Sequence, residues 1–365
     1  MPTLRELSDL GQAVWLDYIR RSFVVGGELQ QWIDRGVRGV TANPTILEKA
    51  IDGSSDYDEH LARLAREGKS ADQIYEALAL EDIGSAADLL RPVYDQFGDG
   101  FVSLEVSPSL AHDTQGTIVS AQHLFAALSR PNVFIKVPAT EEGFPAIEEL
   151  IRQGINVNVT LIFSLAQYEA SAEAYLRGLE RRIEEGKSIS HLASVASFFV
   201  SRVDTAVDKA LEGIGNRDLQ GRIAVANAKL AYARFKEICS GPRWEKLARK
   251  GGKVQRPLWA STGTKNPNYS DTLYVDELIG PHTVNTLPPA TLEAFLDHGK
   301  VALTVGSELG RARSEIDLLA KLGIDLNQVT EQLTVDGVAL FAKSFDTLMA
   351  SIAEKSEKLR SSAQA

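Results

Sequence analysis

Eight short apolar or alternating segments recur along this chain, and helical patterns lie between most of them. We predict strands at 14–19, 37–43, 100–106, 133–139, 156–163, 195–201, 257–261 and 282–288. Alternation of strands with helices is typical of a parallel α/β fold. Eight such units predict a (β/α)8 barrel, an architecture that usually takes about 250 residues.

The 365 residues exceed what such a barrel needs, and the surplus is patterned as helix. We expect additional helices around 52–97, 207–255 and 305–360. Because no proline-rich or low-complexity linker divides the sequence, a single domain over residues 1–365 is predicted. Asn43 before Pro44 is typical of a capped helix start, and Ser164 with Gln167 matches a capping box.

Charge and cysteine usage exclude several classes of protein. The formal net charge of −10 does not favour binding to nucleic acid or anionic lipid. Cys239 is the single cysteine, so no internal disulfide can form, which fits a reducing compartment. The segment MPTLRELSDLGQ lacks an apolar signal pattern and no segment approaches a membrane span, so a cytoplasmic location is expected.

Metal sites are not indicated by the histidines or the cysteine. The six histidines form neither an HxH nor an HExxH pattern, and one cysteine excludes a cysteine-rich zinc site. We therefore expect no metal, although these patterns do not test a magnesium site made of carboxylates alone. The segment EGIGNRDLQG follows a helical pattern instead of a strand, which excludes a dinucleotide-binding turn.

At least six of the predicted strands have one apolar face and one face with polar side chains, because successive residues of a strand point to opposite faces. The polar face includes Asp17, Thr41, Asn43, Ser103, Glu105, Lys136, Asn156, Asn158, Thr160 and Ser197. The apolar face suits surrounding helices, so the polar face is expected to point into the barrel. Since barrel interiors normally hold branched apolar side chains, this pattern predicts an active site there.

Lys136 lies within the apolar segment NVFIKVPATEEG, where an unpaired buried amine is costly. It could lie at a strand end and reach water, or form a structural ion pair with Asp17 or Glu105. In a third interpretation Lys136 is a Schiff-base nucleophile, whose neutral amine attacks a carbonyl. The iminium then accepts electrons as an adjacent C–C bond breaks, and the polar face of the strands favours this interpretation.

Such chemistry also needs groups that move protons and orient hydroxyls. Asp17 and Glu105 are the carboxylates on the predicted inner face, although each could serve only as a partner for Lys136. Hydroxyl-orienting candidates are Thr41, Asn43, Asn158 and Thr160. For Thr41 and Asn43, turn formation and helix capping are the alternative, and these are compatible with a site role.

The segment ASTGTKNPNYSD, after the seventh predicted strand, is the candidate phosphate site. It offers Ser261, the backbone amides around Gly263, and Lys265. Late βα loops often bind phosphate in this architecture. Arg202, at the end of the sixth strand, could add a bidentate contact. The alternative is that Lys265 lies on a solvated loop without a ligand.

From WLDYIRR to LFAKSFDTLM, the chain resembles the longer bacterial branch of the transaldolase family. The motifs are GVTANPTILEKAI, GFVSLEVSP, FIKVPAT, GINVNVTLIFS, SFFVSRVD and RPLWASTGTKNPNYSDTLYV. The resemblance implies a (β/α)8 barrel that works without a metal or organic cofactor. It implies transfer of a dihydroxyacetone unit from sedoheptulose 7-phosphate or fructose 6-phosphate to glyceraldehyde 3-phosphate or erythrose 4-phosphate, in the non-oxidative pentose phosphate pathway.

The resemblance also implies roles for single residues. Lys136 of FIKVPAT would be the Schiff-base residue, and Asp17 of WLDYIRR the acid/base at the cleaved C–C bond. Glu105 of SLEVSP would work through a water held with Thr160. The implied substrate-binding residues are Thr41, Asn43, Asn158, Ser197, Phe199, Arg202 and Ser261. Many relatives have ASFRN, whereas the longer ASTGTKN here makes Lys265 the nearest basic residue.

Two other functions are considered beside transaldolase. The related fructose 6-phosphate aldolases release dihydroxyacetone, and they typically replace the glutamate by glutamine and the phenylalanine by tyrosine. Glu105 and Phe199 therefore favour transfer. A catalytically dead phosphosugar-binding barrel would not need Lys136, Asp17 and Glu105 together. The expected partners are small sugar phosphates, and the sequence is compatible with a homodimer without giving the oligomeric state.

Overall fold

A closed barrel of eight parallel strands forms the centre of the protein, with each strand paired to its neighbours in sequence order. The computed structural model describes residues 1–362. All eight predicted strands and the (β/α)8 fold are confirmed. The strands are β1 (Gln12–Leu16), β2 (Gly39–Thr41), β3 (Phe101–Glu105), β4 (Val133–Pro138), β5 (Val157–Ile162), β6 (Ser194–Phe199), β7 (Gln255–Ala260) and β8 (Thr283–Leu287).

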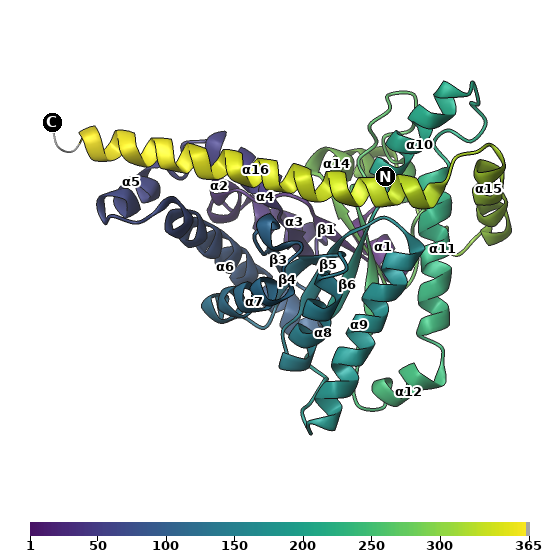
Figure 1. Ribbon diagram of the computed structural model, residues 1–365, viewed down its shortest axis with the longest axis horizontal. Coiled ribbons are helices and arrows are strands. Elements are labelled where there is room, and N and C mark those ends of the chain that lie inside the picture. Colours follow the sequence, from purple (N-terminus) through teal and green to yellow (C-terminus); the bar gives the residue numbers. More distant parts are fainter. Residues whose placement is uncertain (363–365) are drawn as a thin grey trace.

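Helices surround the barrel and fill most of the connections between its strands (Figure 1). In the first half of the chain they are α1 (Leu4–Asp9), α2 (Arg21–Val25), α3 (Glu28–Arg35), α4 (Pro44–Asp52), α5 (Asp58–Arg66), α6 (Ala71–Phe97), the 3-10 helix η1 (Pro108–Leu110), α7 (Thr114–Leu128), α8 (Gly143–Gln153) and α9 (Leu165–Glu184). After β6 they are α10 (Ser201–Gly213), α11 (Ile223–Ile238), α12 (Pro242–Ala248), α13 (Leu273–Asp276), α14 (Pro289–His298), α15 (Leu309–Lys321) and α16 (Leu326–Ser362). The expected caps are present, because Asn43 accepts a hydrogen bond at the start of α4 and Ser164 with Gln167 forms a capping box at α9.

The last helix, α16, is long and lies across the barrel (Figure 1). It contacts α10 and β5 near its beginning and α4, α5 and α6 further along. Side chains fasten it to these elements: the hydroxyls of Thr45 and Ser344 are 2.9 Å apart, and Gln167 donates to Thr334. Because α16 crosses the carboxyl ends of the strands, it forms a roof over that end of the barrel.

The amino-terminal half of the barrel interior is filled by aromatic rings. Trp15 stacks on Phe134 at a ring-centroid distance of 5.9 Å, and Phe134 stacks on Phe101 at 4.3 Å. Gly39 makes room for this cluster, since a Cβ there would come within 2.6 Å of the Trp15 ring. Phe101 and Phe134 lie on the same strand faces as the polar residues further along β3 and β4. Beside this aromatic cluster Trp15 donates a hydrogen bond to Asp99, which also pairs with Arg256.

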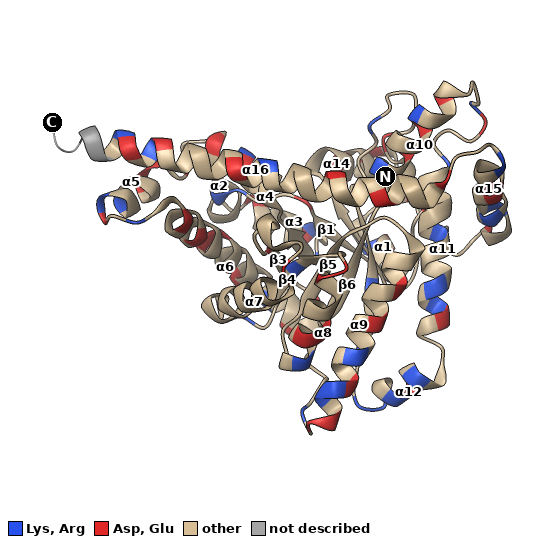
Figure 2. Ribbon diagram, viewed as in Figure 1, with Lys and Arg blue, Asp and Glu red and all other residues tan. Residues whose placement is uncertain are grey.

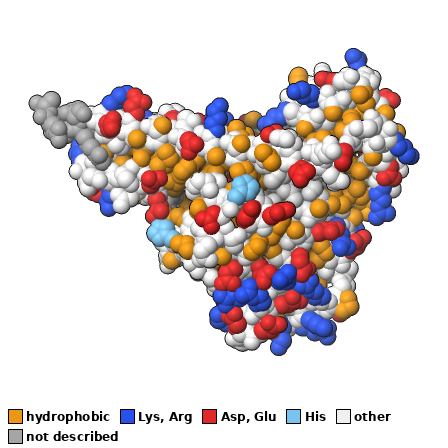
Figure 3. Space-filling view, viewed as in Figure 1, with side chains coloured by type: hydrophobic (Ala, Val, Ile, Leu, Met, Phe, Trp, Pro, Cys, Tyr) orange, Lys and Arg blue, Asp and Glu red, His pale blue; other side chains and the backbone are white. Residues whose placement is uncertain are grey.

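The outer surface mixes charges of both signs, as Figure 2 shows along α9 and α12. Arg181 pairs with Glu148, and Arg243 pairs with Glu173 and Glu180 across neighbouring helices. On the face shown in Figure 3, basic and acidic side chains are intermixed in its lower part. No helix within residues 1–362 combines the length and hydropathy that crossing a bilayer requires.

Candidate active site

A cavity of about 110 Å³ opens at the carboxyl ends of the strands. Ten of the twelve predicted site residues line it: Asp17, Thr41, Asn43, Lys136, Thr160, Ser197, Phe199, Arg202, Ser261 and Lys265. They come from β1, β2 and β4 to β7 and the segments that follow them, and a closed barrel brings these strand ends together. This is the end at which barrels of this architecture carry their active sites.

Lys136 is buried in β4, with only 4% of its surface exposed. It lies beside Glu105 in the register between β3 and β4, and its Nζ is 3.2 Å from Glu105 Oε2. The same amine donates a hydrogen bond of 3.1 Å to the backbone oxygen of Ala42. The interpretation that Lys136 reaches bulk water is therefore wrong. An ion pair with Glu105 is present, and it is compatible with a nucleophilic role.

The two carboxyl groups of the site have raised pKa values. Burial raises the pKa of Glu105, while the nearby Lys136 ammonium opposes this shift. Burial also raises the pKa of Asp17, opposed by the hydrogen bond from Thr41 and by the charge of Lys136. A raised pKa brings a carboxyl group closer to neutral pH, where it can both accept and return a proton.

Thr41 holds Asp17 in place. Its hydroxyl donates to Asp17 Oδ1 at 2.6 Å and lies 2.6 Å from the hydroxyl of Thr286. Thr286 also lines the cavity, and the sequence analysis did not single it out. The alternation within HTVNTLP could have found Thr286, since it occupies the inner face of the last strand.

Thr160 Oγ1 is buried without a hydrogen-bond partner among the described atoms, and Glu105 Oε2 is buried with its ion pair to Lys136 and no further hydrogen-bond partner among them. Buried polar atoms are nearly always hydrogen-bonded, by protein groups or by a bound molecule. Thr160 lines the cavity, whereas Glu105 lies behind Lys136 in the barrel wall. The two oxygens are thus suited to a small molecule that can donate hydrogen bonds.

Asn158 does not line the cavity and is fully buried beneath it. Its amide nitrogen donates to Ser103 at 3.1 Å, and its amide oxygen accepts a hydrogen bond of 2.6 Å from Ser197. In this structure Asn158 therefore orients Ser197, which does line the cavity. Direct contact between Asn158 and a substrate stays a prediction.

The basic side of the cavity is formed after β6 and β7. Arg202, at the start of α10, lies over the rings of Phe199 and Phe341 at 5.3 and 5.7 Å. Ser261 lies in the left-handed region with φ of 55°, and its hydroxyl is 2.9 Å from that of Ser201. Lys265 lines the same cavity from the loop after β7. These groups give one end of the cavity a positive charge suited to an anion.

Phe341 of α16 closes the cavity from above. It is buried, lines the cavity, and its ring centroid is 6.0 Å from Lys136 Nζ. Phe345, one helical turn further, packs against Tyr75 instead. The sequence leaves open whether the C-terminal helical segment with Phe341 and Phe345 closes over the site, because a residue on a long helix carries no local pattern that indicates a distant strand end.

The sequence was also compared with known proteins. The family model described as Transaldolase/Fructose-6-phosphate aldolase matches residues 14–352. The chain belongs to this family. A Transaldolase from Acidothermus cellulolyticus is 50% identical over 363 residues, which cover 98% of each chain. A Transaldolase from Saccharopolyspora erythraea is 47% identical over 360 residues, again 98% of each, and Transaldolase 2 from Nostoc sp. (strain PCC 7120) is 46% identical over 369 residues, 96% of this chain and 97% of the relative.

The transaldolase/fructose-6-phosphate aldolase family unites enzymes that differ in what becomes of the three-carbon unit, and the two residues expected to separate them lie at this site. Glu105 contacts Lys136, and Phe199 lines the cavity beneath Arg202. Neither position holds the glutamine or tyrosine expected of the aldolases. Both residues therefore agree with the names of the relatives.

Proposed function

We propose that this chain is a transaldolase that moves a dihydroxyacetone unit between sugar phosphates through a Schiff base on Lys136. The observation that carries the proposal is a buried lysine beside a carboxylate in a polar cavity at the catalytic end of a barrel. Family membership and the relatives' names support the same reaction. The donors are sedoheptulose 7-phosphate or fructose 6-phosphate, within the non-oxidative pentose phosphate pathway.

The substrate's phosphate binds at the basic end, where Arg202, Ser261 and Lys265 offer a guanidinium fork, a hydroxyl and an amine. This fixes the sugar chain with its ketone toward Lys136. Thr41, Asn43 and Ser197 face the same cavity and can bind sugar hydroxyls. The positive end thus orients the substrate before any covalent step.

The neutral amine of Lys136 attacks the ketone to give a carbinolamine, which loses water to become an iminium ion. Glu105, with its raised pKa, supplies and removes the protons of this step through a water held with Thr160. Thr160 Oγ1 has no other hydrogen-bond partner among the described atoms, and the Glu105 carboxylate can accept from such a water beside its ion pair with Lys136. The ion pair with Glu105 keeps Lys136 directed into the site.

Asp17 takes the proton from the sugar hydroxyl next to the cleaved bond as that C–C bond breaks. The bonding electrons pass into the iminium, which becomes an enamine, and the aldose phosphate leaves. The acceptor aldehyde then receives the enamine carbon, Asp17 returns its proton, and water releases the product ketose from Lys136. Atoms and charge balance over the cycle without a cofactor.

Reductive trapping tests this proposal. Borohydride added with fructose 6-phosphate should attach the three-carbon unit irreversibly to Lys136, as found by peptide mass spectrometry. Lys229, another buried lysine but one paired with Glu277 outside the barrel, is the matched control and should stay unmodified. An adduct on another lysine, or none, would refute the role of Lys136.

Acceptor dependence separates transfer from simple aldol cleavage. A transaldolase should consume fructose 6-phosphate rapidly only when a different aldose phosphate, erythrose 4-phosphate, is added as acceptor. Release of free dihydroxyacetone at the same rate without an acceptor would instead identify a fructose 6-phosphate aldolase. Small sugar phosphates as partners and a cytoplasmic location both belong to this proposal, and a homodimer is compatible with it.

A further inference from the structure

The segment 261–276, which we call the phosphate loop, connects β7 to the end of α13 and carries Ser261 and Lys265 near its start. Its second half is fastened to α10 by two tyrosines. Tyr269 donates to Asp208 Oδ2 at 2.7 Å, and Tyr274 donates to Asp204 Oδ2 at 2.9 Å. Asp204 and Asp208 lie one turn apart on one face of α10, which begins with Ser201 and Arg202.

The same two carboxylates also hold the segment before α11. Asp204 Oδ1 accepts from the amide of Ala224 at 2.8 Å, and Asp208 Oδ1 accepts from the amide of Gly221 at 3.0 Å. Each carboxylate therefore accepts one hydrogen bond from the phosphate loop and one from this backbone. In consequence α10, which carries Arg202, is joined to the loop that carries Ser261 and Lys265.

Burying the carboxyl groups of Asp204 and Asp208 is energetically unfavourable. Asp204 is 1% exposed, and burial raises its pKa to about 7. Burial also raises the pKa of Asp208. Within the part of the chain whose side chains are described, neither carboxylate pairs with a lysine, arginine or histidine; their partners are uncharged. Apolar residues here would avoid the cost of desolvating two acids, so the hydrogen bonds contribute specific geometry instead of net stability.

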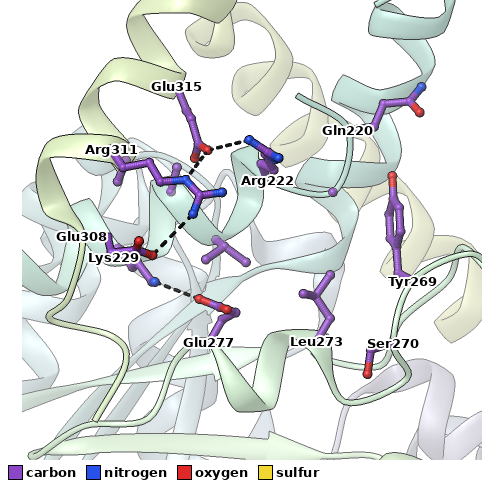
Figure 4. Close-up of a pocket in the computed structure, with 14 residues that line it drawn as sticks. Gln220, Arg222, Lys229, Tyr269, Ser270, Leu273, Glu277, Glu308, Arg311 and Glu315 are labelled. Carbon is purple, nitrogen blue, oxygen red and sulfur yellow. Dashed lines mark hydrogen bonds and ion pairs between the residues drawn. The ribbon is translucent and has the colours of Figure 1, made fainter. Parts of the chain in front are cut away.

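Part of the phosphate loop borders a cavity on the side away from α10. There Tyr269, Ser270 and Leu273 form one wall of a cavity of about 320 Å³, shown in Figure 4. The opposite wall consists of charged groups already paired with one another, among them Lys229 with Glu277 and Arg311 with Glu315. Thr262 fastens the start of the loop to β8 through Asn285, and Asp271 contacts His298 further along. On the α10 side, the tyrosine hydroxyls are the groups that join the loop to the helix carrying Arg202.

The ring of Tyr269 is itself closely fitted. Gly221 has φ of 69°, and a Cβ there would come within 2.8 Å of Tyr269 Cζ. Ser261, at the other end of the loop, is held in the left-handed region and by the hydroxyl of Ser201. A residue in that strained conformation needs its surroundings to hold it, so the loop must be fixed at both ends.

We infer that Asp204 and Asp208 are positioning residues for the phosphate end of the substrate. Through Tyr274 and Tyr269 they hold the phosphate loop so that Ser261 and Lys265 face the same space as Arg202. This inference rests on the proposed function, because it takes that end of the cavity as the phosphate site. Neither aspartate touches the substrate.

Tyr269→Phe and Tyr274→Phe test the inference, since each removes one hydroxyl and keeps the ring. We expect the KM for fructose 6-phosphate to rise about three- to tenfold in each, the equivalent of about one hydrogen bond. We expect kcat, and kcat/KM for unphosphorylated fructose, to change by less than about twofold. Asp208→Asn keeps an acceptor for Gly221 and a hydrogen-bonding group for Tyr269, so it should retain a nearly unchanged KM.

Tyr175→Phe is the matched control, because Tyr175 is also buried and donates to a backbone oxygen, that of Lys253, before the start of β7. It should leave the KM for fructose 6-phosphate unchanged. Equal losses with both donors in Tyr269→Phe, or an unchanged KM in both phenylalanine variants, would overturn the inference. Calorimetric binding of fructose 6-phosphate and fructose needs no turnover, so it decides the inference even if the wild-type chain fails to transfer dihydroxyacetone.

Discussion

The two ends of the barrel interior are formed by the same strand faces but carry different kinds of side chain. At the amino end, Trp15, Phe101 and Phe134 stack into a floor without polar contacts between their rings. One pleat further along β4, Lys136 enters a cavity with two carboxyl groups and several hydroxyls. The depth of a residue along its strand therefore decides whether it supports the fold or forms part of the site.

This division has a physical reason. A reactive amine and two acids must keep fixed positions although their burial is unfavourable. Close-packed aromatic rings directly beneath them supply a stiff support, because protein interiors resist small displacements. The comparison predicts that substitutions at the upper end change catalysis, whereas substitutions in the floor change stability.

The largest effect is expected at Lys136. Lys136→Ala should lower kcat by at least about a thousandfold, because the covalent step is lost and other groups cannot replace the nucleophile. Its unfolding midpoint in denaturant should fall less than that of a floor variant. Lys229→Ala is the control, since it breaks the buried pair with Glu277 outside the barrel and should cost stability while kcat persists. If Lys136→Ala unfolds readily, the amine is structural.

At Phe134, two residues before Lys136, we expect a loss of stability and retained reactivity of Lys136. Phe134→Ala should lower the free energy of unfolding by about 3–5 kcal/mol, because it leaves a cavity in the aromatic floor. Borohydride labelling of Lys136 should persist in the folded fraction. Urea titration gives the stability, and Phe134→Leu should lose less. A fully stable Phe134→Ala would break the comparison.

The comparison also locates a source of pH-dependent stability at the upper end. Burial raises the pKa of Asp204 to about 7, assisted by the nearby Asp208 and opposed by hydrogen bonds from Ala224 and Tyr274. The folded state therefore holds a proton that the unfolded state releases near pH 4. Stability from this group is fully present below about pH 4 and falls by up to about 4 kcal/mol as pH rises through 7.

Asp204→Asn should remove that part of the pH dependence. Its free energy of unfolding, measured with urea from pH 4 to 8, should decline less steeply than that of the wild type. Asp17, Glu105 and Asp208 also have raised pKa values and contribute in the same direction in both proteins, so only the difference between the two curves reports Asp204. Parallel curves would contradict the assignment.

A smaller effect than those above is expected at Arg202. Arg202→Ala should raise the KM for fructose 6-phosphate about 10- to 100-fold, since charge-assisted hydrogen bonds to the phosphate are lost. The KM of Arg202→Lys should lie between those of the wild type and Arg202→Ala, because an ammonium keeps the charge but not the planar fork. Initial rates with fructose in place of fructose 6-phosphate serve as the control. An equal loss with both donors would show that Arg202 does not bind the phosphate.

The sequence predicted the strands and the inward-facing side of the polar groups from local periodicity alone. Alternation placed Asp17, Glu105 and Lys136 on inner faces, which the structure confirms. It did not indicate that Glu105 and Lys136 lie side by side, since that depends on the register between two strands. The roles of the twelve site residues, and a single domain over residues 1–365, stay predictions.

Long-range contacts account for the rest. Phe341 reaches the cavity only because α16 crosses the barrel, and nothing near it in the sequence indicates that path. The attachment of Tyr269 and Tyr274 to α10 likewise joins residues 61 and 70 positions apart in sequence. Periodicity reports which face of an element is buried, but not which distant element buries it.

The helix α16, which forms the roof, is synthesised after all eight strands of the barrel. The eighth strand ends at Leu287 and α16 begins at Leu326, so a growing chain can close its barrel before the roof has been made. Ribosomes add about 5–20 residues per second and release the amino-terminal part first. A chain that closed its barrel before α16 was made would leave Lys136 without the cover of Phe341 until α16 docked.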